Sequence, residues 1–353
     1  MDYVPAMLIS AVIIVAYTAM GGFLAASTTD FIQSIIMSLA LIIVMGFGIS
    51  TAGGLDAVMA NASELAGYLS MTAMHDVATK SSSPYGFITI VSTLAWGLGY
   101  FGMPHILLRF MAIEDDNKLG LSRRVATVWV IISMACAIFI GVIGLAMSKV
   151  GALPVLEGSA SETVIINIAT LLGKNGTGII HLLSIICAGV ILSGILASTM
   201  STADSQLLAA ASSISQNILR DIFHLKIDEK ANIRAARLTV IGISIIAAFI
   251  AKDPDSSVFQ IVSFAWAGFG AVFGPAMLFS LFWKRTGRWG ILAGMVSGGV
   301  MVFFWKYVVR PLGGAWNIYE LLPAFLVACV FIVVVSLLTP APDAEIVKEF
   351  EEV

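Results

Sequence analysis

Long, unbroken apolar runs are the feature that most constrains what this 353-residue chain can fold into. Hydrophobic residues make up 59% of the chain and charged residues 12%, whereas a soluble domain is nearer half apolar and a quarter charged. The runs lack the alternation of a membrane strand, and their lengths suit helices, which need about 20 apolar residues to cross a bilayer. We therefore expect an all-α membrane protein, because lipid offers no partner to exposed backbone groups.

About nine transmembrane helices are expected from these runs. Their ranges are 5–25, 29–50, 87–112, 123–148, 178–205, 234–252, 257–283, 288–310 and 318–339. The segments 51–86 and 149–177 are expected to lie outside the bilayer, the second with a short interfacial helix near residues 162–172. The fifth helix is expected to continue in polar form to about Arg220, because residues 206–219 keep helical character.

Positive charge predicts the orientation of the chain. The loops near 109–124, 220–237 and 284–288 hold about twice as many lysines and arginines as the loops expected on the other side of the membrane. Cytoplasmic loops typically carry such an excess of positive charge. We therefore expect the N-terminus outside the cell membrane and the acidic tail 340–353 in the cytoplasm.

Several other classes of protein find little support in the composition. Cys136, Cys187 and Cys329 lie singly in apolar runs and are interpreted as core residues. The four histidines are scattered, and the net charge of −3 leaves no basic face for nucleic acid. The sequence places neither a nucleophile–base pair nor clustered metal ligands at membrane depth, so we expect no enzyme and no cofactor.

The segment Trp96–His105 holds three glycines and one proline inside an apolar span. Proline removes a backbone donor and glycine weakens a helix, so we expect the helix to kink or open near Gly102–Pro104. Interrupted helices mark binding sites in transporters. Trp96, Tyr100 and Pro104 recur every four residues, which places them on one helix face that could line a solute pocket. A structural kink with aromatic packing is the alternative.

A stripe of hydroxyl side chains follows one face of the expected fifth helix. It comprises Ser198, Ser201, Thr202 and Ser205, and Asp204 lies beside it. Hydroxyl and carbonyl oxygens suit a hard cation such as Na⁺. Such hydroxyls can instead donate to carbonyls one turn earlier or join neighbouring helices. The spacing leaves both interpretations open.

Asp30 stands near the expected start of the second span, with Gln33 three residues later. This spacing favours Asp30 as a helix N-cap with Gln33 closing a capping box. The alternative is that Asp30 faces inward and supplies the carboxylate of a cation path.

Four segments carry a resemblance to a known family. They are 17–33, 96–110, 200–213 and 263–275, and they run through nearly the whole chain. They resemble the sodium:solute symporter family, and within it the sodium/proline symporters. The resemblance implies the inverted-repeat fold of the leucine transporter. The resemblance divides this chain into five segments. They are two helices of the first repeat in 1–50, an extracellular loop in 51–86, the second repeat in 87–283, two accessory helices in 284–339 and the cytoplasmic tail in 340–353.

The resemblance also implies roles for particular residues. The implied sodium ligands are the carbonyl of Ser198 and the hydroxyls of Ser201 and Thr202. The positions implied for a second cation site or an ion path are Asp30, Asp204 and Ser205. The positions implied for the solute are Trp96, Tyr100 and Pro104.

The function implied is sodium-coupled symport of a small solute across the cytoplasmic membrane, with L-proline as the leading substrate. The alternatives are a symporter for another small organic solute such as pantothenate, or a membrane sensor that does not transport. Members of the family begin with further helices, one of them unwound and carrying sodium and substrate ligands. We therefore expect the chain as given to be incomplete for transport.

Overall fold

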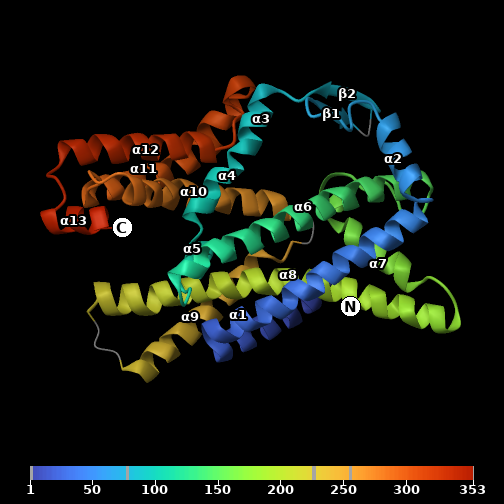
Figure 1. Cartoon of the computed structure of the whole chain (residues 1–353), viewed down its shortest axis with the longest axis horizontal. Coiled ribbons are helices and arrows are strands. Elements are labelled where there is room, and N and C mark those ends of the chain that lie inside the picture. Colours follow the sequence, from blue (N-terminus) through green and yellow to red (C-terminus); the bar gives the residue numbers. More distant parts are fainter. Residues whose placement is uncertain (1–2, 77–78, 225–227, 254–256, 353) are drawn as a thin grey trace. The chain divides into compact units, whose positions relative to one another are not determined.

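The computed structural model describes residues 3–76, 79–224, 228–253 and 257–352 (Figure 1). The domain division expected from the sequence runs from residue 1 to residue 353. Residues 1–2 and 353 lie outside the described ranges. The chain forms two compact units, Met1–Leu69 with Glu114–Ser256 and Ser70–Ile113 with Ser257–Val353. We refer to them as unit 1 and unit 2 and describe each by itself.

The secondary-structure elements described in unit 1 are all helical. Its helices are α1 (Tyr3–Thr51), α2 (Leu55–Glu64), α6 (Leu119–Lys149), α7 (Val164–Gly173), α8 (Gly178–Ser212) and α9 (Glu229–Ile250). A π-helix, Ser213–Ile222, extends α8, and short 3₁₀ turns lie at Asp116–Lys118 and Gly158–Thr163. The short helix expected near 162–172 is confirmed as α7, and the polar extension of the fifth helix is confirmed in helical form to Ile222.

Unit 2 combines a short β-ribbon with helices. Its elements are β1 (Ala73–Asp76), β2 (Ser81–Pro84), α3 (Phe87–Leu94), α4 (Trp96–Gly99), α5 (Pro104–Met111), α10 (Val258–Phe282), α11 (Arg288–Phe304), α12 (Leu321–Leu338) and α13 (Ala344–Glu352). Short helical turns follow α4 at Tyr100–Gly102 and α11 at Trp305–Val309, Arg310–Leu312 and Gly314–Trp316. β1 and β2 pair antiparallel, with Ala73 opposite Pro84, a ribbon that the sequence analysis did not predict.

The first expected loop lies at a different position from the one predicted. α1 has 49 residues, or about 74 Å at 1.5 Å per residue, which is far longer than one crossing. The helical conformation breaks inside it at Gly22, with φ 62° and ψ −160°. These angles are open almost only to glycine, so the chain turns at Gly22 and not near residues 26–28 as expected.

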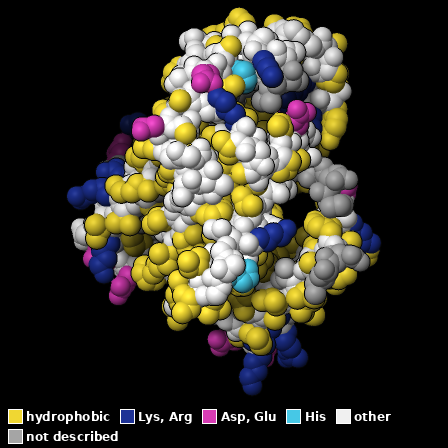
Figure 2. Space-filling model, turned by 90° about the vertical axis from the view of Figure 1, so that its right-hand side faces the viewer, with side chains coloured by type: hydrophobic (Ala, Val, Ile, Leu, Met, Phe, Trp, Pro, Cys, Tyr) yellow, Lys and Arg dark blue, Asp and Glu magenta, His cyan; other side chains and the backbone are white. Residues whose placement is uncertain are grey.

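The apolar helices agree with a membrane protein of several spans. Seven described helices are long and apolar enough to cross a bilayer, and the bent pair Phe87–Gly102 and Pro104–Met111 brings the number to eight. Because Gly22 divides α1 into two parts, the expected count of about nine is consistent with the structure. Large apolar side chains are exposed along these helices, as on α6 at Val125, Val128 and Ile132. Hydrophobic side chains cover much of the face seen in Figure 2.

Each unit has its own buried core. In unit 1, Val44 of α1 packs with Ile143 and Met147 of α6, Ile168 of α7 and Ile191 of α8. In unit 2, α10, α11 and α12 lie side by side, as Figure 1 shows. Small residues permit this close packing, since a Cβ on Gly298 of α11 would meet the backbone of α10.

Candidate functional site

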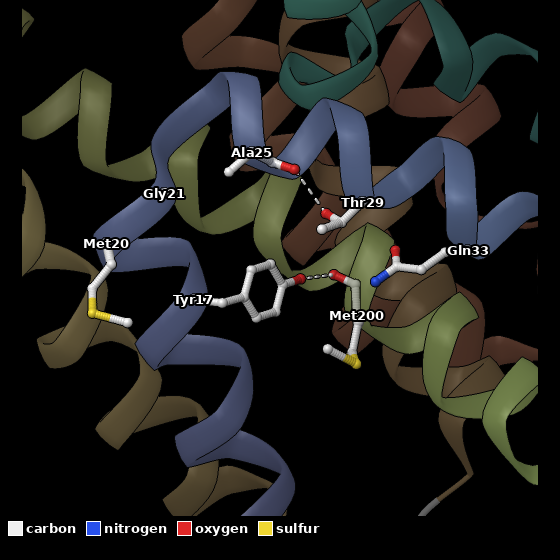
Figure 3. A pocket seen from close by; sticks show the side chains of 7 residues that line it. All are labelled: Tyr17, Met20, Gly21, Ala25, Thr29, Gln33 and Met200. Atoms are coloured by element: carbon white, nitrogen blue, oxygen red, sulfur yellow. Dashed lines mark hydrogen bonds between the residues drawn. The ribbon is translucent and has the colours of Figure 1, made fainter.

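A cavity of about 380 Å³ lies in unit 1, where α1 breaks beside α8. Its lining comes from both sides of the break and from one residue of α8 (Figure 3). The lining residues are Tyr17, Met20, Gly21, Ala25, Thr29, Gln33 and Met200. The wall is mainly apolar, and its polar groups are hydroxyls, an amide and backbone carbonyls.

Asp204 is the most deeply buried carboxylate beside this cavity, with none of its surface exposed. The Tyr17 hydroxyl donates a hydrogen bond to Oδ2 of Asp204 over 2.7 Å, and it also lies 3.3 Å from the carbonyl oxygen of Met200. The Ser205 hydroxyl lies 3.2 Å from Oδ1 of the same carboxylate. The bond from the Tyr17 hydroxyl stabilises a negative charge that burial alone would make costly.

The N-cap interpretation of Asp30 is wrong. The helix that starts after Gly22 is regular as far as Thr51, so Asp30 lies two turns inside it and cannot cap it. One carboxylate oxygen of Asp30 is fully buried. Gln33, one turn later, is only 8% exposed, and its amide points toward the Tyr17 hydroxyl and the Met200 carbonyl in Figure 3. The Gln33 amide oxygen accepts no hydrogen bond within the described part of the chain.

The hydroxyl stripe on α8 forms bonds within its own helix. The hydroxyls of Ser201 and Thr202 lie 3.1 and 3.2 Å from the carbonyl oxygen of Ser198, to which both donate. The Ser205 hydroxyl donates to the carbonyl of Ser201 over 2.9 Å. The sequence alternative of bonding one turn earlier is therefore what these hydroxyls do in this structure. A hydroxyl that donates one bond still offers its oxygen lone pairs to another partner.

The break expected near Gly102–Pro104 is confirmed in unit 2. Met103 has extended angles, φ −81° and ψ 109°, and the helices on its two sides differ in direction by 48°. Pro104 opens α5 at its first position, where its missing N–H has no helical partner to lose. The single face expected for Trp96, Tyr100 and Pro104 is therefore interrupted, because Pro104 lies beyond the break.

The aromatic residues before the break form a cluster with α10 and with Tyr319. Trp96 stacks on Phe259, Trp266 and Tyr319, with ring centroids 5.4, 5.9 and 5.8 Å apart. The Trp266 indole N–H donates to the Trp96 carbonyl over 3.0 Å. Tyr100 meets Trp266 edge-on at 4.8 Å and remains 57% exposed. Packing of this kind fixes the Trp96 ring and leaves Tyr100 accessible.

The residues predicted for the site thus fall into two groups. Asp30 on α1 and Asp204 with the hydroxyl stripe on α8 lie in unit 1, while Trp96, Tyr100 and Pro104 lie in unit 2. Sequence reasoning missed the partners Tyr17 and Tyr319. The available signal was a polar or amphipathic ring inside an apolar run, which needs a hydrogen-bond partner when buried.

A multispan helical membrane protein with two interrupted helices has the architecture of a secondary transporter. The chain belongs to the sodium:solute symporter family, which it matches over residues 1–298. The members of this family and the relatives described below are transporters and not enzymes.

Individual relatives match nearly the whole chain. The sodium/proline symporter of Haemophilus influenzae is 39% identical over 99% of this chain and 67% of its own length. The osmoregulated proline transporter OpuE of Bacillus subtilis is 36% identical over 97% of this chain and 64% of its own length. The sodium/proline symporter of Escherichia coli is 35% identical, over the whole chain and 66% of its own length. The chain therefore spans about two thirds of the length of these relatives.

A solved structure shares the fold. A Na⁺-coupled sialic acid symporter in a substrate-bound, outward-open state matches 97% of this chain and 68% of its own chain, with a TM-score of 0.72 and 15% identity. The likeness supports the leucine-transporter-like fold expected from the sequence.

Proposed function

We propose that this chain forms the greater part of a Na⁺-coupled symporter for a small solute, with L-proline as the leading substrate. The observation that carries the proposal is the similarity, over nearly the whole chain, to relatives that are named proline transporters. In this proposal, residues 1–50 end the first repeat, 51–86 form an extracellular loop, 87–283 form the second repeat and 284–339 form accessory helices. The N-terminus lies outside, and the tail 340–353 lies in the cytoplasm.

The proposed sodium site uses the α8 stripe. The hydroxyl oxygens of Ser201 and Thr202 and the carbonyl of Ser198 are hard, neutral ligands of the kind that Na⁺ prefers. Because these hydroxyls already donate to Ser198, their lone pairs can face an ion without breaking the helix. A site without formal charge binds weakly, which allows the ion to be released at each cycle.

The proposed second cation site or ion path uses Asp30, Asp204 and Ser205. Asp204 offers a buried carboxylate whose charge is stabilised by the Tyr17 hydroxyl, and the Ser205 oxygen lies 3.2 Å from its other carboxylate oxygen. A cation next to it would lower the cost of burying that charge. The cavity beside the Gly22 break gives a hydrated ion room to approach this region of α8.

The proposed solute positions are Trp96, Tyr100 and Pro104. Proline has an apolar ring and two charged groups, so it needs a flat apolar surface and polar backbone groups together. The accessible Tyr100 ring supplies the first. Backbone groups along the interrupted segment before Pro104 are proposed to supply the second. This chemistry would suit other small amino acids less well, because they lack the ring.

The energetics of such coupling are sufficient for uptake. One charge moving through 100 mV provides about 2.3 kcal/mol, and a tenfold Na⁺ gradient provides about 1.4 kcal/mol. Together they support accumulation of roughly several hundredfold for one Na⁺ per solute.

Uptake by purified protein tests the proposal. The chain, with any segment that its gene places before residue 1, is reconstituted into liposomes, and labelled L-proline uptake is measured with Na⁺ or K⁺ outside. The proposal is supported if proline uptake requires Na⁺ and is not inhibited by unlabelled pantothenate. Uptake that is equal in the two salts, or Na⁺-dependent uptake of pantothenate but not proline, contradicts it. Proline binding without uptake favours the sensor alternative.

Paired substitutions separate the two sites. Replacing Ser201 and Thr202 by alanine removes about 1 kcal/mol per hydroxyl, so the Na⁺ concentration for half-maximal uptake should rise roughly 30-fold. Replacing Trp96 by alanine should weaken the apparent affinity for proline more than that for Na⁺. If the double variant requires the same Na⁺ concentration as the wild-type protein, Ser201 and Thr202 are not sodium ligands.

A further inference from the structure

A cluster of charged side chains around a buried carboxylate in unit 2 has no part in the proposed transport steps. Glu320, just before α12, has only 1% of its side chain exposed. Its Oε2 lies 2.7 Å from Nη1 of Arg310, and its Oε1 lies 3.9 Å from Nζ of Lys306. The Lys306 ammonium also lies 3.6 Å from the centre of the Phe264 ring on α10. Glu320 is therefore held from two sides.

Stability alone is a weak reason for such a cluster. Desolvation of a buried pair offsets much of its attraction, so an apolar replacement of the whole cluster is often neutral or better. A buried pair does fix the positions of the backbone segments that carry it. Here the segment fixed is the start of α12, and the residue next to Glu320 is Tyr319.

Tyr319 connects the start of α12 to the broken span. Its backbone N–H donates to the Ser92 hydroxyl over 3.0 Å, and its side-chain hydroxyl donates to the Ser263 carbonyl over 2.5 Å. Its ring is 6% exposed and stacks on Trp96 at 5.8 Å with 17° between the planes. The three contacts reach α3, α10 and α4, so a shift of Tyr319 would move the Trp96 ring.

We propose that Tyr319 is a positioning residue for the solute site, and that Glu320, held by Arg310 and Lys306, keeps it in place. Tyr319 covers one face of Trp96, and Trp266 and Phe259 pack against the same indole. The α11–α12 connection thereby sets the orientation of Trp96 and the apparent affinity for the solute, without touching the ion ligands on α8. This proposal rests on the proposed function, because it takes Trp96 as a solute-binding residue.

The test compares Glu320→Gln with Glu351→Gln. Both changes remove one carboxylate charge from a salt bridge in unit 2, but Glu351 pairs with Lys284 at the surface and is 58% exposed. We expect Glu320→Gln to raise the KM for proline about tenfold, which corresponds to about 1.4 kcal/mol. The maximal rate and the Na⁺ requirement of this variant should stay close to those of the wild-type protein. Glu351→Gln should leave the KM, the maximal rate and the Na⁺ requirement unchanged.

A structural role alone would give a different pattern. Fewer folded molecules would lower the maximal rate at an unchanged KM. That result, or a Na⁺ requirement that rises as much as the KM, overturns the proposal. Tyr319→Phe serves if Glu320→Gln does not fold, because it keeps the ring and loses only the bond to Ser263. It should raise the KM by a smaller factor, and an unchanged KM counts against the proposal.

A second readout does not depend on transport. Glu320→Gln removes no aromatic ring, so a changed near-ultraviolet circular dichroism spectrum would report movement of the Trp96 cluster. We expect that change in Glu320→Gln and not in Glu351→Gln, with the far-ultraviolet spectrum the same in both. If the unchanged protein shows no proline uptake, the proposed function fails while this spectrum still tests the positioning. Identical near-ultraviolet spectra in all three proteins would refute it.

Discussion

The two breaks in the apolar helices differ in how they are made and in what surrounds them. The break in α1 is made by Gly22 at a positive φ, and it leaves a cavity of about 380 Å³ beside the buried Asp204. The break before α5 is made by an extended Met103 and by Pro104, and it is packed by aromatic rings and by glycine contacts with α10. The first break is open and lies beside a buried carboxylate, whereas the second is filled by apolar side chains.

This difference corresponds to two tasks within the proposed function. A small cation needs oxygen ligands and a path for water, which a cavity beside a carboxylate provides. A solute with an apolar ring needs a rigid surface, which a packed aromatic cluster provides. A change at the first break should therefore alter the Na⁺ requirement, and a change at the second should alter the affinity for the solute.

The largest expected effect is that of Asp204→Asn. Loss of the charge weakens the bond from Tyr17 and removes the anion proposed to attract the cation. Hydrogen bonds to charged groups contribute about 1.5–3 kcal/mol, so the Na⁺ requirement should rise roughly 10- to 100-fold. Asp221→Asn, at an exposed acid near the end of the α8 extension, is the matched control and should have no effect. If the two variants require the same Na⁺ concentration, Asp204 has no role in coupling.

A smaller effect, on stability, is expected for Gly22→Ala. Alanine at φ 62° and ψ −160° is strained by about 1–3 kcal/mol, so the protein should unfold at a lower temperature in detergent. Gly46→Ala is the control, because Gly46 lies in the same helix with helical angles and open space at its Cβ position. It should be neutral or stabilising by up to about 1 kcal/mol. Equal melting temperatures would mean that α1 can continue straight through residue 22.

The sequence predicted one of these breaks and not the other, for a physical reason. Pro104 excludes a regular helix by its chemistry, so the break before α5 could be located within two residues. Gly22 merely permits a turn, and glycines also occur inside straight helices here, as Gly46 does. Asp30 shows the same limit, since a capping pattern depends on where the helix begins. Tyr17 and Asp204 are 187 residues apart, and only the folded chain shows that they meet.

Gly102→Ala tests whether close packing at the second break matters. A Cβ at Gly102 would lie 2.8 Å from the Gly274 nitrogen and 3.0 Å from the Gly270 Cα. Both are backbone atoms of α10, which cannot move aside as the end of a flexible side chain can. Overpacking of this kind costs about 1–3 kcal/mol, and here it should raise the KM for the solute with little change in the Na⁺ requirement. Gly97→Ala, with open space at its Cβ, is the control. A larger effect on Na⁺ than on the solute would reverse the assignment of the two breaks.

The smallest expected effect separates the ring of Tyr100 from its hydroxyl. Tyr100→Ala loses an edge-on contact with Trp266 that contributes about 0.5–1.5 kcal/mol, so the KM for proline should rise roughly two- to tenfold. Tyr100→Phe keeps the ring and should leave the KM nearly unchanged, since an apolar surface is what the second break is proposed to offer. If Tyr100→Phe is as impaired as Tyr100→Ala, the hydroxyl binds the solute directly. The second break would then be polar in its chemistry, and its contrast with the cavity beside Asp204 would be lost.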